Sequence, residues 1–275
     1  MPETPALRLI DTHCHLNHPR LLRRLPEVLA RARAAGVSDM VVVGYDLPSS
    51  RRAVELAAQH EGLWATVGVH PHDAGAITGA DYTELRALAR SGKVVAIGET
   101  GLDFYRDLSP RDAQMIAFQR HLDLAAELNL PTVIHCREAQ DAVLEVVAKR
   151  VKPVLGPDPE MSPQPPIIWH CFDGTLDHML LALAAGMAFG IGGGLTHRAA
   201  ADLRRVVARI PLPRLLLETD APYLAPELQR SRDNEPGNLP LVAQALAAAR
   251  GDTLESIAAA TSENARRVFG LDGRE

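Results

Sequence analysis

The chain has 275 residues, of which 47% are hydrophobic, enough for one sizeable core or two small ones. Its formal net charge of −5 argues against a strongly basic nucleic-acid-binding groove. Aromatic residues make up only 4%, which argues against base stacking as the main mode of binding. Neither value excludes an enzyme that holds phosphates through metal ions and a few local arginines.

The three cysteines are odd in number and widely spaced, which predicts a reducing compartment rather than a disulfide framework. Residues 1–8 show no secretory pattern, and no run of 18 apolar residues is present. We therefore expect a cytoplasmic protein with no membrane partner. We also expect a monomer, although none of these features tests the oligomeric state.

Eight short apolar runs rich in β-branched residues recur along the chain, separated mostly by stretches with helical periodicity. The predicted strands are 7–11, 39–44, 63–69, 94–99, 132–136, 167–171, 187–192 and 215–220. The predicted helices are 21–35, 50–59, 82–90, 111–129, 139–149, 176–185 and 198–210, with two more within 239–269. Several strands are continuously apolar, as strands buried on both faces should be.

This alternation predicts an α/β protein with a (β/α)8 TIM barrel as a single domain over residues 1–275. An open, doubly wound sheet is the alternative. Residues 151–166 depart from the pattern because they contain six prolines, which are incompatible with a helix. We interpret this segment as a surface loop extension without a chemical role.

Residues of metal-ligand type stand at the ends of most predicted strands. The candidates are His13, His15, Glu99, His135, His170 and Asp220. In a parallel barrel these strand ends converge on one mouth. His13 and His15 are two residues apart in a strand and therefore point to the same side.

Buried imidazoles and carboxylates without partners would be costly, and divalent ions would satisfy them. Six candidate ligands exceed the need of one tetrahedral site with an open position, so they suit two ions. Glu99, from a strand roughly opposite His13 and His15, is the candidate bridge.

The remaining histidines and the cysteines have simpler interpretations. We expect His18, His60, His121, His178 and His197 to be surface or capping groups. Strand alternation predicts that Cys14, Cys136 and Cys171 point away from the mouth and pack between sheet and helices.

Six motifs carry a resemblance to a known family. They are D-T-H-C-H-L at 11–16, G-V-H-P-H at 68–72, G-E-T-G-L-D at 98–103, H-C-R-E-A at 135–139, H-C-F-D-G at 170–174 and E-T-D-A-P-Y-L at 218–224. This ordered set resembles the TatD-related metal-dependent hydrolases of the amidohydrolase superfamily, from Ile10 to about Phe269.

The resemblance implies a (β/α)8 barrel, a pair of divalent ions and phosphodiester cleavage, typically 3′→5′ exonuclease action on DNA. From the mixed imidazole and carboxylate ligands we expect the ions to be Mg, Mn or Zn. Its implied roles are His13 and His15 on the first ion, Glu99 as bridge, His135 and His170 on the second ion, Asp220 on the first ion beside the attacking water, and His70 near the substrate phosphate.

From this arrangement we expect Asp220 to accept the water's proton and His70 to meet the phosphate charge. Arg137 and Arg232 are candidate substrate-binding residues, since guanidinium groups match phosphate geometry. Where the family usually has H-C-F-S-G, this chain has Asp173 in place of the serine, and we assign it no role.

Other functions remain open on the sequence alone. The main alternative is a metal-dependent hydrolase of a small ester, lactone or amide. Two further alternatives are a metal-binding protein without activity and an arginine-bearing loop, 230–236, that recruits a nucleic-acid or protein partner.

Overall fold

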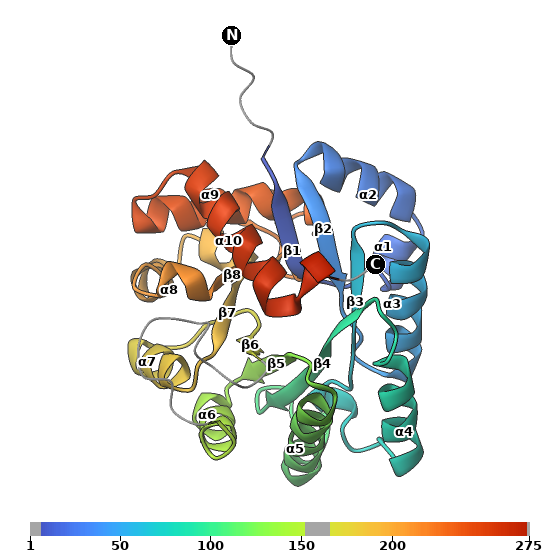
Figure 1. Ribbon diagram of the computed structural model, residues 1–275. Helices are drawn as coiled ribbons and strands as arrows, with labels where there is room; N and C mark the ends of the chain where they lie inside the picture. The colour runs from blue at the N-terminus through green and yellow to red at the C-terminus, as the bar shows by residue number, and fades with distance from the viewer. Residues whose placement is uncertain (1–6, 152–165, 274–275) are drawn as a thin grey trace.

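The computed structural model of the protein describes residues 7–151 and 166–273 (Figure 1). Eight parallel strands form one sheet in the order of the sequence. They are β1 Leu9–Cys14, β2 Val37–Val42, β3 Leu63–Val67, β4 Val94–Asp103, β5 Thr132–Arg137, β6 Ile167–Trp169, β7 Ala188–Ile191 and β8 Leu215–Leu217. Each lies within a few residues of a predicted strand.

Helices connect the strands and form an outer ring (Figure 1). They are α1 Pro19–Leu22, α2 Leu25–Ala34, α3 Leu47–Gln59, α4 Gly79–Leu88, α5 Arg111–Leu128, α6 Gln140–Ala148, α7 Leu176–Ala184, α8 Ala201–Val207, α9 Leu239–Arg250 and α10 Leu254–Phe269. Short 3-10 helices are η1 Pro71–Asp73, η3 Gly193–Thr196, η4 Leu212–Arg214, η5 Glu227–Gln229, η6 Pro236–Asn238 and η7 Leu271–Gly273.

The sheet closes on itself between its first and last strands. The backbone N–H of Asp220 donates to the carbonyl of His13 at 2.8 Å, and that of His15 donates to the carbonyl of Ala221 at 2.7 Å. Closure with strands in sequence order is the topology of the TIM barrel. The prediction of a (β/α)8 barrel is confirmed, and the doubly wound alternative is wrong.

The barrel interior is apolar at one end and polar at the other. Ile10, Val41, Val95 and Ile168 are among the buried side chains of one apolar cluster inside the strands. Phe269 of α10 belongs to the same cluster, because α10 lies across the end of the barrel where the strands begin (Figure 1). The opposite mouth is therefore the end left for polar side chains.

One predicted helix is divided in two. The sequence predicted a single helix over 21–35, whereas α1 ends at Leu22 and α2 begins at Leu25. Pro26 stands in the first turn of α2, where its missing N–H is tolerated but a continuing helix is not. The proline-rich segment predicted at 151–166 lies almost entirely outside the described residues.

Among the described residues no helix has both the length and the apolar character needed to span a membrane.

Candidate metal centre

A first group of ligand atoms lies between β1 and the end of β8. The Nε2 atom of His15 is 3.2 Å from Oδ1 of Asp220, and Nε2 of His13 is 3.7 Å from the same oxygen. Oε2 of Glu99 is 3.5 Å from the Nε2 of His13 and 3.9 Å from that of His15. The two imidazoles and two carboxylates therefore face one small volume.

A second group surrounds the other oxygen of Glu99. Its Oε1 lies 2.9 Å from Nδ1 of His135, 3.7 Å from Nε2 of His170 and 3.7 Å from Nε2 of His70. The ring of His170 also stacks on that of His13, with centroids 3.5 Å apart. The two oxygens of Glu99 thus face two different sets of histidines, which is the arrangement that a bridging carboxylate requires.

The histidines of the first group need a partner that the protein does not provide. His13 is fully buried, yet neither of its ring nitrogens has a hydrogen-bond partner among the described residues. The Nδ1 of His15 is buried and unpartnered as well. Burying such polar atoms without a partner is costly, and imidazole with carboxylate is a donor set suited to divalent ions. The residues present therefore fit the expected metal.

The surroundings of the centre shift the pKa values of several of its carboxylates and imidazoles. Burial alone would raise the pKa of Glu99, but the nearby charge of His13 and the hydrogen bond with His135 outweigh it and hold that pKa well below its usual range. Burial, with the neighbouring imidazoles His170 and His135, lowers the pKa values of His13 and His70 respectively. Ionised carboxylate and neutral imidazole are the protonation states that bind metal ions.

Two acidic residues that were not among the predicted ligands, Glu218 and Asp103, contact the ring nitrogens of His170 and His135 that face away from Glu99. Glu218 is buried, lies 2.8 Å from Nδ1 of His170 and accepts the backbone N–H of Cys171 at 2.6 Å. Burial opposes protonation of His170, but Glu218 above all raises its pKa to about 10. The same negative field would favour a divalent cation.

The other overlooked residue is Asp103, which is also fully buried. Its Oδ2 is 3.0 Å from Nε2 of both His72 and His135, so it orients the ring that meets Glu99. Partners of this kind fix the orientation of ligating histidines. Strand alternation could have found both acids, since Glu99 and Asp103 are four residues apart on β4 and Glu218 precedes Asp220 by two.

Backbone contacts between β1 and the segment after β8 position Asp220. Its φ of 56° lies in the left-handed region, which aspartate tolerates better than most residues. Buried Asp11 accepts both the backbone N–H and the hydroxyl of Thr219, at 3.0 and 2.6 Å. The side-chain amide of Asn234 donates to the carbonyl of Thr219 at 2.7 Å. The turn that carries Asp220 is therefore held from two sides.

The structure places the remaining predicted site residues at different distances from the centre. His70 lies against Glu99, within reach of the second group. The Arg137 guanidinium lies 3.9 Å from the centroid of the Tyr105 ring, at the rim rather than in the centre. Arg232 is exposed on the loop after β8 and forms no ion pair with a described residue. Exposed Asp173 accepts a hydrogen bond from Gln140 at 3.4 Å.

Two predictions about uninvolved residues are wrong. Cys171 has a φ of 47°, and its sulfur lies within 4.8 Å of ligand atoms of His170 and Asp220 rather than against the helices. Because β6 ends at Trp169, strand alternation no longer applies to it. His121 is neither exposed nor a cap: it is fully buried in α5, where its Nε2 accepts the backbone N–H of Val69 at 3.1 Å.

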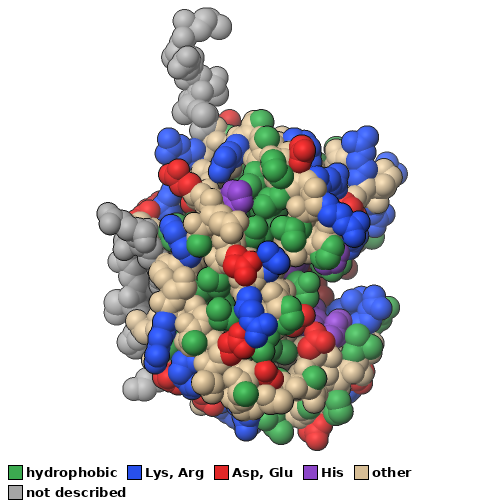
Figure 2. All heavy atoms as spheres, turned by 90° about the vertical axis from the view of Figure 1, so that its right-hand side faces the viewer, with side chains coloured by type: hydrophobic (Ala, Val, Ile, Leu, Met, Phe, Trp, Pro, Cys, Tyr) green, Lys and Arg blue, Asp and Glu red, His purple; other side chains and the backbone are tan. Residues whose placement is uncertain are grey.

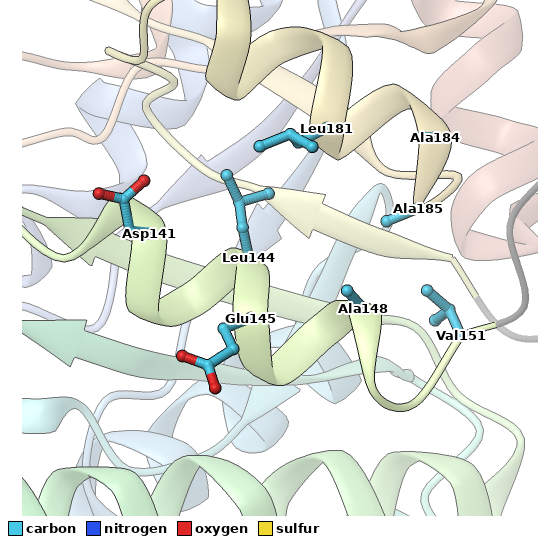
Figure 3. A pocket seen from close by; sticks show the side chains of 8 residues that line it. All are labelled: Asp141, Leu144, Glu145, Ala148, Val151, Leu181, Ala184 and Ala185. Carbon is cyan, nitrogen blue, oxygen red and sulfur yellow. The ribbon is translucent and has the colours of Figure 1, made fainter.

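The mouth is open to solvent. Figure 2 shows a hollow at its right-hand margin, with histidine side chains in its walls and Lys or Arg side chains above and below it. A separate pocket of about 350 Å³ lies between α6 and α7, lined mainly by apolar side chains that include Leu144, Leu181 and Ala185 (Figure 3). No histidine lines that pocket, so it is not part of the centre.

At the mouth of this TIM barrel, histidines and carboxylates surround a glutamate whose two oxygens face different histidines. This is the site of a metal-dependent hydrolase. A family model described as TatD related DNase matches residues 10–270. The chain belongs to this family.

Individual relatives agree over nearly the whole chain. It is 42% identical over 269 residues to a protein of Erwinia tasmaniensis named 3′-5′ ssDNA/RNA exonuclease TatD, covering 96% of this chain and 100% of the relative. It is 38% identical over 264 residues, with the same coverage, to the uncharacterized metal-dependent hydrolase YabD of Bacillus subtilis. The crystal structure of YjjV, a TatD homolog from Escherichia coli k12, superposes with a TM-score of 0.87 at 29% identity, covering 96% of this chain and 99% of that one. The expected class, a hydrolase of the TatD-related family, is confirmed.

Proposed function

We propose that this chain is a metal-dependent exonuclease that removes nucleotides from the 3′ end of single-stranded DNA. The observation that carries the proposal is the position of Glu99. Its two carboxylate oxygens face two separate sets of histidines. The named activity of relatives near 40% identity supports the polarity and the single-stranded substrate.

The centre would hold two divalent ions (Mg, Mn or Zn). His13, His15 and Asp220 would hold one, His135 and His170 the other, and Glu99 would bridge them. Ions held there would supply Lewis acidity, which acidifies water and neutralises charge on a phosphodiester.

The exposure of each carboxylate indicates which of them can accept a proton from water. The side chain of Asp220 is 12% exposed, more than the 4% of Glu99. Asp220 is therefore the carboxylate that water reaches, and we assign it the proton of the attacking water. Its lowered pKa, set by His15 and other histidines against the effect of burial, makes it a weak base.

His70 and His135 present their exposed edges to the mouth, with side chains 13% and 17% exposed. A phosphate entering the mouth meets these imidazoles first, and Arg137 stands at the rim beside them. We assign His70 to the position of the scissile phosphate, and Arg137 and Arg232 to backbone phosphates farther along the strand.

The alternative of a small ester, lactone or amide substrate is not favoured. Likeness to an organophosphorus hydrolase, with a TM-score of 0.59 at 16% identity, shows only a shared fold. We further propose that the protein acts as a monomer in the cytoplasm. All candidate site residues come from one chain, and its three cysteines are free.

The test uses one single-stranded oligonucleotide labelled at either end. Attack from the 3′ end turns a 5′-labelled strand into a ladder of shorter products, whereas a 3′-labelled strand releases labelled mononucleotide at once. Chelation should stop turnover, and added Mg²⁺ or Mn²⁺ should restore it. The reverse labelling pattern overturns the polarity, and turnover that survives chelation overturns the metal dependence.

The role of Asp220 is tested by Asp220→Asn, which keeps the shape of the side chain but removes its basicity. We expect kcat to fall by about 10²–10⁴-fold, as for loss of a general base. Glu263→Gln on the exposed face of α10 is the matched control and should leave kcat unchanged. Normal turnover by Asp220→Asn refutes the assigned role.

A further inference from the structure

Two loops at the mouth expose apolar side chains that a folded protein would otherwise bury. Of the eight large hydrophobic side chains exposed among the described residues, five lie in the loops after β4 and β8. They are Tyr105, Leu108, Tyr223, Leu224 and Leu228. Concentrated exposure of this kind marks a surface that binds something.

In each loop the exposed tyrosine is stacked against an arginine. The guanidinium of Arg137 lies 3.9 Å from the centroid of Tyr105, and that of Arg20 lies 5.1 Å from the centroid of Tyr223. Asp233 holds Arg20 in place through a 2.9 Å ion pair. With 53% of Tyr105 and 43% of Tyr223 exposed, much of each ring stays available to a ligand.

The Tyr223 stack adjoins the first ligand group of the metal centre. The Tyr223 ring lies 5.7 Å from that of His15, which in turn lies 5.4 Å from the ring of half-buried Tyr45. Two tyrosines therefore flank one histidine of the first group.

The Tyr105 stack adjoins the second group. Tyr105 follows Asp103 by two residues, Arg137 follows His135 by two, and Asp103 pairs with Arg137 across the β4–β5 ladder. The two stacks therefore belong to opposite sides of the centre. Three of the four tyrosines lie at this mouth, and the fourth, Tyr82, is buried in α4.

We propose that these two stacks, Tyr105 with Arg137 and Tyr223 with Arg20, each bind one unpaired base, on the two sides of the scissile phosphate. The proposal rests on the proposed function and specifies how that site selects its substrate. Every base has a face that an aromatic ring can stack on, so these subsites tolerate any sequence. Bases inside a duplex do not offer their faces, so the same subsites favour a single strand.

The low aromatic content does not argue against this arrangement. Two bases need only two rings, and the two exposed tyrosines adjoin the two different ligand groups of the centre. The arginine in each stack adds a positive charge beside the ring, suited to the backbone phosphate that accompanies a stacked base.

The test compares strands that differ only in one base. A single-stranded oligonucleotide is used intact, with an abasic residue at its 3′ terminus, or with an abasic residue at the next position. For the wild-type protein each abasic residue should raise KM roughly 5- to 150-fold, the equivalent of about 1–3 kcal/mol per stacked base. Tyr105→Leu and Tyr223→Leu keep apolar bulk without an aromatic face. In these variants the KM of the abasic strand divided by the KM of the intact strand should fall towards one.

The pattern among variants assigns each ring to a base. In each leucine variant the abasic-to-intact KM ratio should fall towards one for one abasic position and stay at the wild-type value for the other. Tyr105→Phe and Tyr223→Phe should show the wild-type ratio at both positions. Leu180→Ala, which changes an equally exposed apolar residue on α7, is the control and should behave as wild type.

Failure of the proposed function and failure of this inference are distinguishable. A wild-type protein that degrades no oligonucleotide contradicts the proposed function. A wild-type protein that degrades the strands while the leucine variants keep its KM ratios contradicts the stacking subsites alone. KM values that rise together for all strands, with the ratios unchanged, show a merely structural role for the tyrosines and also overturn the inference.

Discussion

Buried His121 makes the stability of the barrel depend on pH in a calculable way. Its Nδ1 lies 2.7 Å from the carbonyl of Ala117, and its Nε2 accepts the backbone N–H of Val69 at 3.1 Å. The ring is therefore neutral, with its proton on Nδ1. Protonation of Nε2 would place a second N–H against that of Val69, the residue before His70.

Burial lowers the pKa of His121 from its ordinary 6.5 to about 4. Between these values the unfolded chain binds a proton that the folded protein does not. The free energy of unfolding is therefore undiminished above pH 6.5 and falls as the pH drops, by up to about 1.4 kcal/mol per pH unit. The shift corresponds to a loss of about 3 kcal/mol by pH 4.

The measurement is urea denaturation from pH 7 to pH 4, in the presence of chelator, for wild type and His121→Gln. Glutamine does not titrate, and its amide offers one donor and one acceptor for the same two backbone partners. Other buried groups titrate alike in both proteins, so the difference between the two unfolding free energies isolates His121. That difference should be constant above pH 6.5 and should move by about 3 kcal/mol in favour of the variant by pH 4. Parallel curves over the whole range would refute the reasoning.

Two further predictions concern the carboxylate behind His170. Glu218→Gln removes the charge that orients that ring, so affinity for the metal should fall about 10- to 100-fold, measured by competition with a chelating dye. Gly190→Ala should act in the same direction, because its Cβ would lie 2.1 Å from Oε2 of Glu218. Gly194→Ala is the matched control, since a Cβ there meets no atom within 4 Å. Unchanged affinity in Glu218→Gln and Gly190→Ala would show that Glu218 does not support the centre.

The barrel was predictable because its signals are local and repeated. Runs such as that of β8 are apolar at consecutive positions, as a strand covered on both faces should be, and the intervening helices have clear periodicity. The convergence of His13, Glu99 and His170 then follows from topology, since parallel strands in a closed sheet end at one mouth. These residues lie on β1, on β4 and directly after β6, yet the fold alone brings them together.

What escaped prediction depends on contacts between residues far apart in the chain. Their spacing from Glu99 and Asp220 marks Asp103 and Glu218 as further candidates, but only the folded structure shows that they contact the far sides of the His135 and His170 rings. Cys171 escaped because β6 is short and the backbone turns into the left-handed region just after it. His121 lies on a helix with no other sign of function, and its partner Val69 is 52 residues away.

The charge of the centre also explains how an acidic protein would accept an acidic substrate. Glu99, Asp103, Glu218 and Asp220 are all buried and have lowered pKa values, so the mouth contains four ionised carboxylates, which outnumber the two imidazoles with raised pKa values, His135 and His170. Such a mouth would repel a phosphodiester, and two arginines at its rim would not reverse that field. Under the proposed function, divalent cations are therefore required for binding as well as for chemistry, because they change the sign of the charge that the phosphate meets. The aromatic faces of Tyr105 and Tyr223 add attraction for the bases that does not depend on that sign.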